Sequence, residues 1–473
     1  MPNQKNYLIK IICKITYSNL IIMATFFMPL NYVRADGNRL KNYLKNTLAL
    51  VQSQNVLVFQ NPNKIEVALE ISERGRARAF VELLARRLGL STINPPTTDQ
   101  IKQVAKQQNA TLVEYSLITN ELAINGKHQT QESELFIWVI KPTGEILFRR
   151  VDLKKMLPKE NNSLADFINQ TPMAIGTSNR SIIPITSHAK EKLKKLYEIL
   201  IHPISDILPT NPDEHVIFIP QGELFLVPFA ALQNAQGKYL IENHTISTAP
   251  SIQALDLLAQ FKQRHKRQKT QDVLVVGNPI MPTVVLKPGD KPHQFSPIPG
   301  AEQEAKAIAT IMNTQALTGK AATEIEVVQR IPKARIIHLA TNTYIDTMQG
   351  FKSFLAFAPS ASSDGLLTID EINNLQLYAE LVVLSSSQTA LGRITGDGVI
   401  GLSRAFFAAG VPSVIGSLWY VSNQSTLFFM TEFYKNLREN TDKATALRQA
   451  MLATMKKYPH PMEWAAFTLI GVS

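Results

Sequence analysis

The sequence predicts an α/β protein in which helices flank a mostly parallel sheet, preceded by a short helical segment and a small β-containing region. From about residue 190, continuous apolar runs alternate with segments of helical periodicity, the pattern of parallel strands covered on both faces. Upstream, residues 38–58 and 64–90 repeat apolar side chains with helical spacing. The 473 residues, 45% of them apolar and 18% charged, are enough for two or three globular domains.

Residues 1–35 have the order of features found in a signal peptide. Three lysines precede a short apolar run at 20–30, and Val33-Arg34-Ala35 offers a small-residue cleavage site. We therefore expect export or a cell-envelope location; the alternative is a cytoplasmic protein with an apolar helix docked on its body. The only cysteine, Cys13, lies in this segment, so the remaining chain contains no thiol nucleophile and no cysteine-based zinc site.

A helical cap is expected over residues 36–109, and the small β-containing region and a connector over 110–190. Strand-like runs occur at 112–117, 135–141 and 145–149. The turn residues at 141–144, which include proline and glycine, predict that the last two runs form a hairpin. Residues 155–190 are polar and lack periodicity, so they are expected to connect the domains.

The main α/β domain is expected over residues 191–473. Its strands are expected at 216–219, 273–276, 335–340, 380–385, 414–418 and 464–470. Its helices are expected at 189–204, 301–312, 398–409, 424–437 and 442–457. The segment between 276 and 301 is rich in proline and is expected to be a loop.

Two of these strands end in small polar residues. One closes with Ala340-Thr341-Asn342, and the other closes with Ser385-Ser386-Ser387. In parallel α/β sheets, binding and catalytic sites form in the crevice outside the carboxyl ends of the strands. The sequence therefore predicts a functional site where these two strand ends meet.

The residues around both strand ends resemble the CHAT family, which consists of caspase-like cysteine peptidases often found beside tetratricopeptide repeats (TPR). Residues 336–343 read IIHLATNT where the family has HLATHG, and residues 382–392 read VVLSSSQTALG where the family has LSACQTALG. The resemblance covers roughly residues 64–471 and also includes 219–224, 227–232, 249–251, 298–302 and 398–406. It implies a caspase-like fold and a TPR-like nature for the helical cap at 36–109.

The resemblance also implies that the catalytic histidine and cysteine are missing, because Asn342 and Ser387 stand at those two positions. An asparagine amide has no nitrogen that accepts a proton, and a serine hydroxyl is a poor nucleophile without a base. Thr343 replaces a glycine that helps to form the oxyanion hole in caspase-like folds. An acidic pair common in the family after the residue matching Trp419 is also absent here. The residues expected to line a peptide crevice are Thr343, Asp346, Ser386, Gln388, Trp419, Ser422 and Asn423.

A displaced base for Ser387 is the alternative to loss of catalysis. His338 lies four residues before Asn342 and thus about 13 Å back along the strand, so a role in the core is expected for it. Asp346 and Asp397 are loop carboxylates that could approach the crevice. The fold alone decides where the more distant histidines lie: His215, His244 and His460.

The function expected from the sequence is that of a catalytically inactive pseudopeptidase that binds a protein or peptide. The alternative is a caspase-like hydrolase that uses Ser387 and a displaced base. The net charge of +11 is not accompanied by a nucleic-acid motif, so no specific nucleic acid is expected. The basic run Lys262–Lys269 is interpreted as either a solvated loop or a patch for an acidic partner. No cofactor or metal is expected: residues 396–401 do not open a dinucleotide-binding unit, and no metal-ligand spacing occurs.

Overall fold

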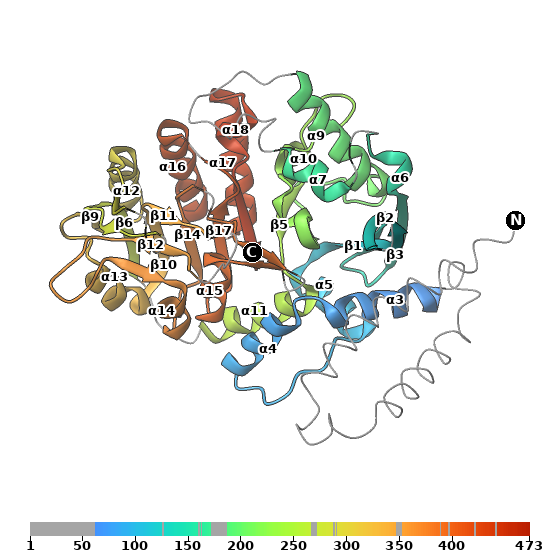
Figure 1. The fold of residues 1–473 in the computed structure, drawn as a ribbon, viewed down its shortest axis with the longest axis horizontal. Coiled ribbons are helices and arrows are strands. Elements are labelled where there is room, and N and C mark those ends of the chain that lie inside the picture. Colours follow the sequence, from blue (N-terminus) through green and yellow to red (C-terminus); the bar gives the residue numbers. More distant parts are fainter. Residues whose placement is uncertain are drawn as a thin grey trace, which may run out of the picture.

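A computed structural model describes residues 62–473, except 125–126, 159–160, 162, 172–186, 266–271, 287–288, 290, 347–351, 388, 396–397, 421 and 440–441. The expected signal peptide and the helical periodicity at 38–58 lie outside the described residues. The described chain is built around one sheet of 11 strands, with helices on both faces (Figure 1). This arrangement confirms the α/β fold class.

The sheet is mostly parallel. One parallel ladder joins five strands, in the order β9 (Ala316–Gly319), β6 (Asp272–Pro279), β10 (Ala334–Ala340), β14 (Leu381–Leu384) and β17 (Ser413–Ser417). A second parallel ladder joins β5 (Thr245–Thr248), β4 (His215–Ile219) and β1 (Ala110–Ile124). Between them lies β18 (Phe467–Gly471), antiparallel to β17 and joined to β5 by the single pair Ile470–Thr248. The expected terminal strand is thus confirmed, and it connects the two ladders.

Each face of the sheet has its own hydrophobic core, because continuous apolar strands present apolar side chains on both sides. The upper core in Figure 1 is formed with α9 (Ser187–Leu200), α12 (Pro299–Ile311), α16 (Asn423–Glu439) and α17 (Lys443–Lys457). The lower core is formed with α4 (Arg78–Arg87), α5 (Thr98–Gln108), α11 (Ile252–His265), α13 (Glu324–Arg330), α14 (Ile369–Asn374) and α15 (Leu402–Ala408).

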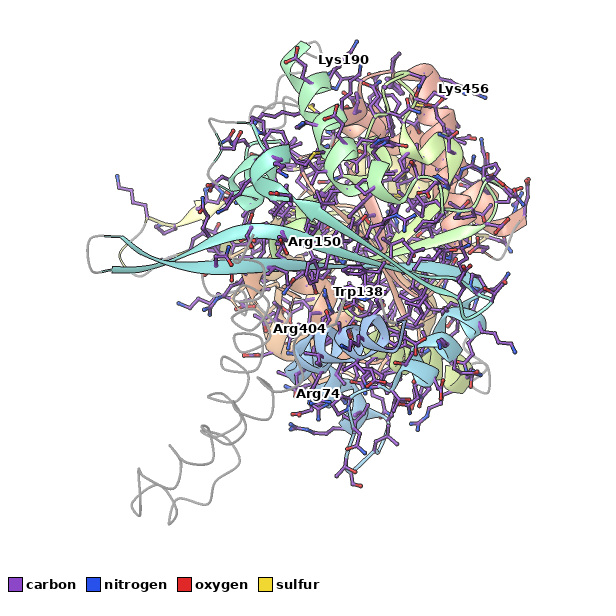
Figure 2. All side chains as sticks on the ribbon, turned by 90° about the vertical axis from the view of Figure 1, so that its right-hand side faces the viewer. Arg74, Trp138, Arg150, Lys190, Arg404 and Lys456 are labelled. Atoms are coloured by element: carbon purple, nitrogen blue, oxygen red, sulfur yellow. The ribbon has the colours of Figure 1, made fainter. Side chains whose placement is uncertain are left out.

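The expected small β-containing region is part of the main sheet. Its first strand, β1, pairs in parallel with β4, and β2 (Lys127–Ile140) and β3 (Ile146–Asp152) follow as antiparallel strands. The turn between β2 and β3 closes as predicted, with Gly144 N donating to Lys141 O at 2.9 Å. β1 and β2 are longer than predicted and project beyond the body as a two-stranded hairpin (Figure 2). Residues 110–152 therefore extend the α/β sheet, because β1 completes its ladder of backbone hydrogen bonds on β4.

The expected helix over 64–90 is in fact two helices, α3 (Pro62–Gly75) and α4. The break comes at Ala77, whose φ of 51° lies in the left-handed region. α4 packs against α11 and α15, and α5 packs against β1 and α11, so these helices cover the lower face of the sheet. The described helices of the expected cap therefore pack directly on the α/β body.

The break between α3 and α4 turns Arg76 into a buried cluster with Glu73 and Glu114. Arg76 Nη2 lies 3.2 Å from Glu114 Oε1, and Arg76 Nε lies 3.5 Å from Glu73 Oε1. The guanidinium also donates to two carbonyl oxygens, Pro220 O at 2.9 Å and Tyr115 O at 2.6 Å. This Arg76 cluster fastens the helical cap to the interior of β1 and to the residue that follows β4.

The predicted helix over 398–409 is shorter than expected. Residues Gly398–Ile400 form β16, which pairs with β15 (Arg393–Thr395), and α15 begins at Leu402. The chain passes very close to itself here: a Cβ on Gly401 would lie 2.5 Å from Leu391 O. Two short strands, β5 and β9, were not predicted at all.

Candidate functional site

The two polar strand ends lie side by side, as predicted. β10 and β14 are parallel neighbours whose register runs from Ile336–Leu381 to Leu339–Leu384, so the two strands end together. Beyond them, the hydroxyl of Thr343 donates to Ser387 O at 3.3 Å. The structure therefore brings the positions of Asn342, Thr343 and Ser387 to one edge of the sheet.

Hydrogen bonds from small side chains hold the strand ends together. Thr341 N donates to Ser386 Oγ at 3.3 Å, and the Ser386 hydroxyl donates in turn to Thr341 O. Ser386 is only 7% exposed. Ser386 was expected to line the crevice, but its side chain instead joins the two strands beneath the surface.

Asn342 and Ser387 have different surroundings at the two strand ends. The Asn342 side chain is partly buried and donates through Nδ2 to Ser296 O at 2.9 Å, while its backbone carbonyl accepts from Ala356 N. Ser387 is partly exposed. Among the residues that the structure describes, no imidazole or carboxylate forms a hydrogen bond with the Ser387 hydroxyl. Asp397, one candidate base, lies outside the described residues.

His338 belongs to the core, as expected. It is 0% exposed, and its Nδ1 lies 3.2 Å from the Tyr434 hydroxyl. Its Nε2 lies 3.1 Å from Glu304 Oε1, within ion-pair distance but without the alignment of a hydrogen bond. The same carboxylate accepts the Ser385 hydroxyl. Burial, followed by the Glu304 charge, raises the pKa of Tyr434 well above its usual value.

The other candidate histidines have partners elsewhere in the fold. His215 Nε2 lies 2.9 Å from Ser247 Oγ, and His460 Nδ1 accepts from Met462 N at the start of α18 (Pro461–Trp464). Burial lowers the pKa of both His215 and His244 to about 4. Neither of these two is therefore protonated at neutral pH.

The segment after β17 differs from the expectation in one respect. Trp419 is 2% exposed and donates from Nε1 to Met462 O at 3.0 Å, so its indole belongs to the core and its expected role in lining the crevice is wrong. Ser422 is partly exposed and Asn423 is exposed at the start of α16. A Cβ on Gly300 would lie 2.5 Å from Asn423 Cβ, so α12 and α16 begin in close contact.

A buried carboxylate that the sequence reasoning missed lies behind this segment. Glu463 is 7% exposed, and its Oε2 accepts the hydroxyl of Ser425. Ser425 Oγ lies 3.3 Å from Ser422 Oγ. Asp346 is partly buried and its backbone N donates to Ser353 Oγ at 3.0 Å, whereas Gln388 lies outside the described residues.

A cavity of about 420 Å³ adjoins the end of β10 and was also missed. Residues 278–281, 294–297 and Gly319 line it, and we refer to it as the loop cavity. The carbonyl of Ser296, which accepts from Asn342, belongs to its wall. The only sequence signal was the proline-rich loop, which does not reveal a cavity.

The described part of the basic run is used within the chain. The Lys262 ammonium donates to Ser473 O, and Arg264 Nη2 donates to Leu88 O at 2.7 Å. His265 is 5% exposed and its ring lies 5.7 Å from that of Tyr378. Arg264 is nevertheless exposed and keeps its positive charge, and residues 266–269 of the run lie outside the described residues.

Two kinds of feature are absent from the described residues. They contain no group of three or more His, Cys, Asp and Glu side chains placed to hold a metal ion. None of their helices combines the length and the apolar character needed to cross a membrane.

The described chain is thus an α/β protein with a polar site at one edge of its sheet. Two parallel strands end there beside a cavity, which is where such sheets form binding and catalytic sites. The chain belongs to the CHAT domain family, whose model matches residues 190–472. Tetratricopeptide repeat protein 28 of Homo sapiens is 31% identical over 387 residues, and its Mus musculus counterpart is 31% identical over 382 residues. Each match covers 70% of this chain but only 15% of the relative's length.

Solved structures also match at low identity. The Saccharomyces cerevisiae separase–securin complex matches with 12% identity and a TM-score of 0.47, over 91% of this chain and 35% of the other. The Arg-specific cysteine proteinase gingipain R (RgpB) matches with 11% identity and a TM-score of 0.34, over 65% and 74% of the two chains.

Proposed function

We propose that the chain binds a peptide segment of a partner protein at the ends of β10 and β14 and does not cleave it. The observation that carries this proposal is the state of Asn342 and Ser387. The Asn342 amide cannot accept a proton and is engaged with Ser296 O, and the Ser387 hydroxyl has no hydrogen-bonded base among the described residues. Hydrolysis by a hydroxyl nucleophile requires such a base.

Support for binding comes from the parts of the site that do not depend on a nucleophile. The strand ends are fixed to one another through Ser386 and Thr343, and the crevice edge adjoins the loop cavity. Such a rigid edge with a concave neighbour suits recognition, because little entropy is lost when the ligand binds.

A digestion experiment tests the absence of cleavage. The purified full chain and its Ser387→Ala variant are incubated with a peptide library, and products are identified by mass spectrometry. We expect neither protein to cleave. Cleavage by the unaltered chain that is lost in Ser387→Ala would refute the proposal and support the alternative, a hydrolase that uses Ser387 with a displaced base.

A binding experiment tests the location. We expect Ser387→Trp, which places a large side chain at a partly exposed strand end, to abolish retention of library peptides. Ser205→Trp, at an exposed serine after a short 3₁₀ helix, serves as the matched control and should retain them. Equal retention by both variants would place the peptide elsewhere.

We also propose that the protein is exported to the cell envelope, on the basis of the charged, apolar and small residues in 1–35. N-terminal sequencing of the protein from its native cells tests this. A mature chain that begins after Ala35 supports export, and a chain that retains residues 1–35 would refute it.

A further inference from the structure

We infer that the loop cavity receives an apolar side chain of the bound peptide, and that the peptide residue beside it is acidic. This inference rests on the peptide-binding function proposed above and specifies the chemistry of the partner. The residues that line the cavity come from three separate stretches of the chain, so the inference depends on the tertiary structure.

The cavity suits a large apolar side chain. Its volume of about 420 Å³ falls in the range of ligand pockets, and its wall includes Met281 and Phe295. Ile280, also in the wall, is 43% exposed and adds accessible apolar surface to the cavity. Burial of this surface would favour an apolar side chain of the ligand.

A row of aromatic rings continues from the cavity to the crevice. The Phe295 ring lies 6.2 Å from that of Phe354, which stacks on Tyr344 at 5.4 Å. Tyr344 follows Asn342 by two residues. Phe354 is 7% exposed and is therefore a buried link between the partly exposed rings of Phe295 and Tyr344, which would border an extended peptide that crosses Asn342.

The cavity wall is also attached to the strand end itself. Asn342 Nδ2 donates to Ser296 O at 2.9 Å, and the Thr341 hydroxyl lies 3.9 Å from the sulfur of Met281. Because an extended chain advances about 3.3 Å per residue, a peptide bound at Asn342 reaches the cavity within one or two residues. The cavity and the strand ends thus form one continuous site.

The charge at the cavity rim favours an acidic neighbour. Lys320 directly follows the lining residue Gly319, is exposed, and forms no ion pair with any residue that the structure describes. The carboxylate of Glu302, at the start of α12, is already engaged by Asn278 Nδ2 at 3.1 Å and by Lys306 Nζ at 2.6 Å. Lys320 therefore leaves a positive charge that an acidic peptide residue would neutralise.

Affinity selection with the full chain tests the inference. A random library of acetylated octapeptides is incubated with the protein, and retained peptides are sequenced by mass spectrometry. We expect enrichment of Leu, Met or Phe next to Asp or Glu. Ser296→Trp fills the cavity but keeps the carbonyl that Asn342 uses, and should weaken retention about tenfold or more.

A charge reversal provides a readout that misfolding cannot imitate. Lys320→Glu should change the preferred neighbour from acidic to basic, while Lys333→Glu, an exposed lysine just before β10, should leave the preference unchanged. Retention of no peptide by the unaltered chain would refute the proposed function itself. Retention of peptides without the apolar–acidic pair, unchanged in Ser296→Trp, would overturn only this inference. Self-association lost in Ser296→Trp would also overturn it, by assigning the cavity to a second copy of the chain.

Discussion

Removal of the guanidinium from the Arg76 cluster should detach the helical cap from the sheet. Arg76 is 7% exposed and is the only described cation at ion-pair distance from either Glu73 or Glu114. Glu73 in turn accepts from the backbone N of Ile252 and Gln253 at 3.2 and 3.1 Å, at the start of α11. Arg76→Met keeps much of the side-chain volume and removes only the charge and its donors.

The decrease in the free energy of unfolding can be estimated from the two carboxylates that lose their partner. The substitution removes two ion pairs, of 3.2 and 3.5 Å, and leaves two carboxylates in the core without a counter-charge. Removal of one partner from a buried ion pair costs about 3–5 kcal/mol. We therefore expect the free energy of unfolding to fall by about that amount at pH 7.5.

The loss should depend on pH in a defined direction. Burial raises the pKa of Glu73 and of Glu114, while the charge of Arg76 lowers both. The raised pKa of each carboxyl in the folded state lies above its unfolded value of about 4.3. At pH values between these two pKa values the folded state binds more protons than the unfolded state, so stability falls as the pH rises through this range. Without Arg76 the folded-state pKa of both carboxyls rises further, so this pH range extends upward. The cost of Arg76→Met should therefore be smaller at pH 5.5 than at pH 7.5.

Urea unfolding followed by tryptophan fluorescence measures the effect. Trp138 is a suitable reporter, because its Nε1 donates to Ile65 O of α3 at 3.2 Å. Arg330→Met serves as the control: Arg330 pairs with Glu326 on the surface of α13 and should cost at most about 0.5 kcal/mol. Equal losses in both variants, or an Arg76→Met loss that does not change with pH, would refute the reasoning.

The remaining predictions concern the crevice and two buried groups. Asn342→His combined with Ser387→Cys should restore at most trace cleavage of library peptides, because Thr343 still replaces the oxyanion-hole glycine; efficient cleavage would show that the rest of the pocket is intact. Glu304→Leu should lower the free energy of unfolding in urea by about 2–4 kcal/mol, because it leaves buried polar partners unsatisfied; a neutral effect would show that these groups do not depend on the carboxylate. Burial lowers the pKa of Lys443 to about 7, so between pH 7 and its unfolded value of about 10.4 the unfolded state binds more protons and stability rises with pH, by up to about 1.4 kcal/mol per unit. Urea unfolding between pH 6.5 and 8.5 should show this rise in the unaltered chain and not in Lys443→Met; equal slopes would contradict it.

Much of the fold could be predicted because its strongest signals are local. β6, β10 and β14 are continuous apolar runs, and such runs identify buried parallel strands without knowledge of their neighbours. β5 and β9, four residues each and partly polar, lack that signal and were missed. The helix break at Ala77 was missed for a different reason, because Arg76 turns inward to partners 39 and 144 residues away in the chain.

The sequence alone determined which side chains stand at the two strand ends, and therefore which chemical groups the site can use. Asn342 and Ser387 follow from the order of residues, and their proximity follows from the rule that parallel strands end at a common edge. Their partners could not be predicted. The burial of Ser386 and Trp419, and the cavity next to Asn342, depend on side chains 40 or more residues apart that only the folded chain brings together. Side-chain burial and hydrogen bonding are properties of the packed molecule, so only the tertiary structure decided them.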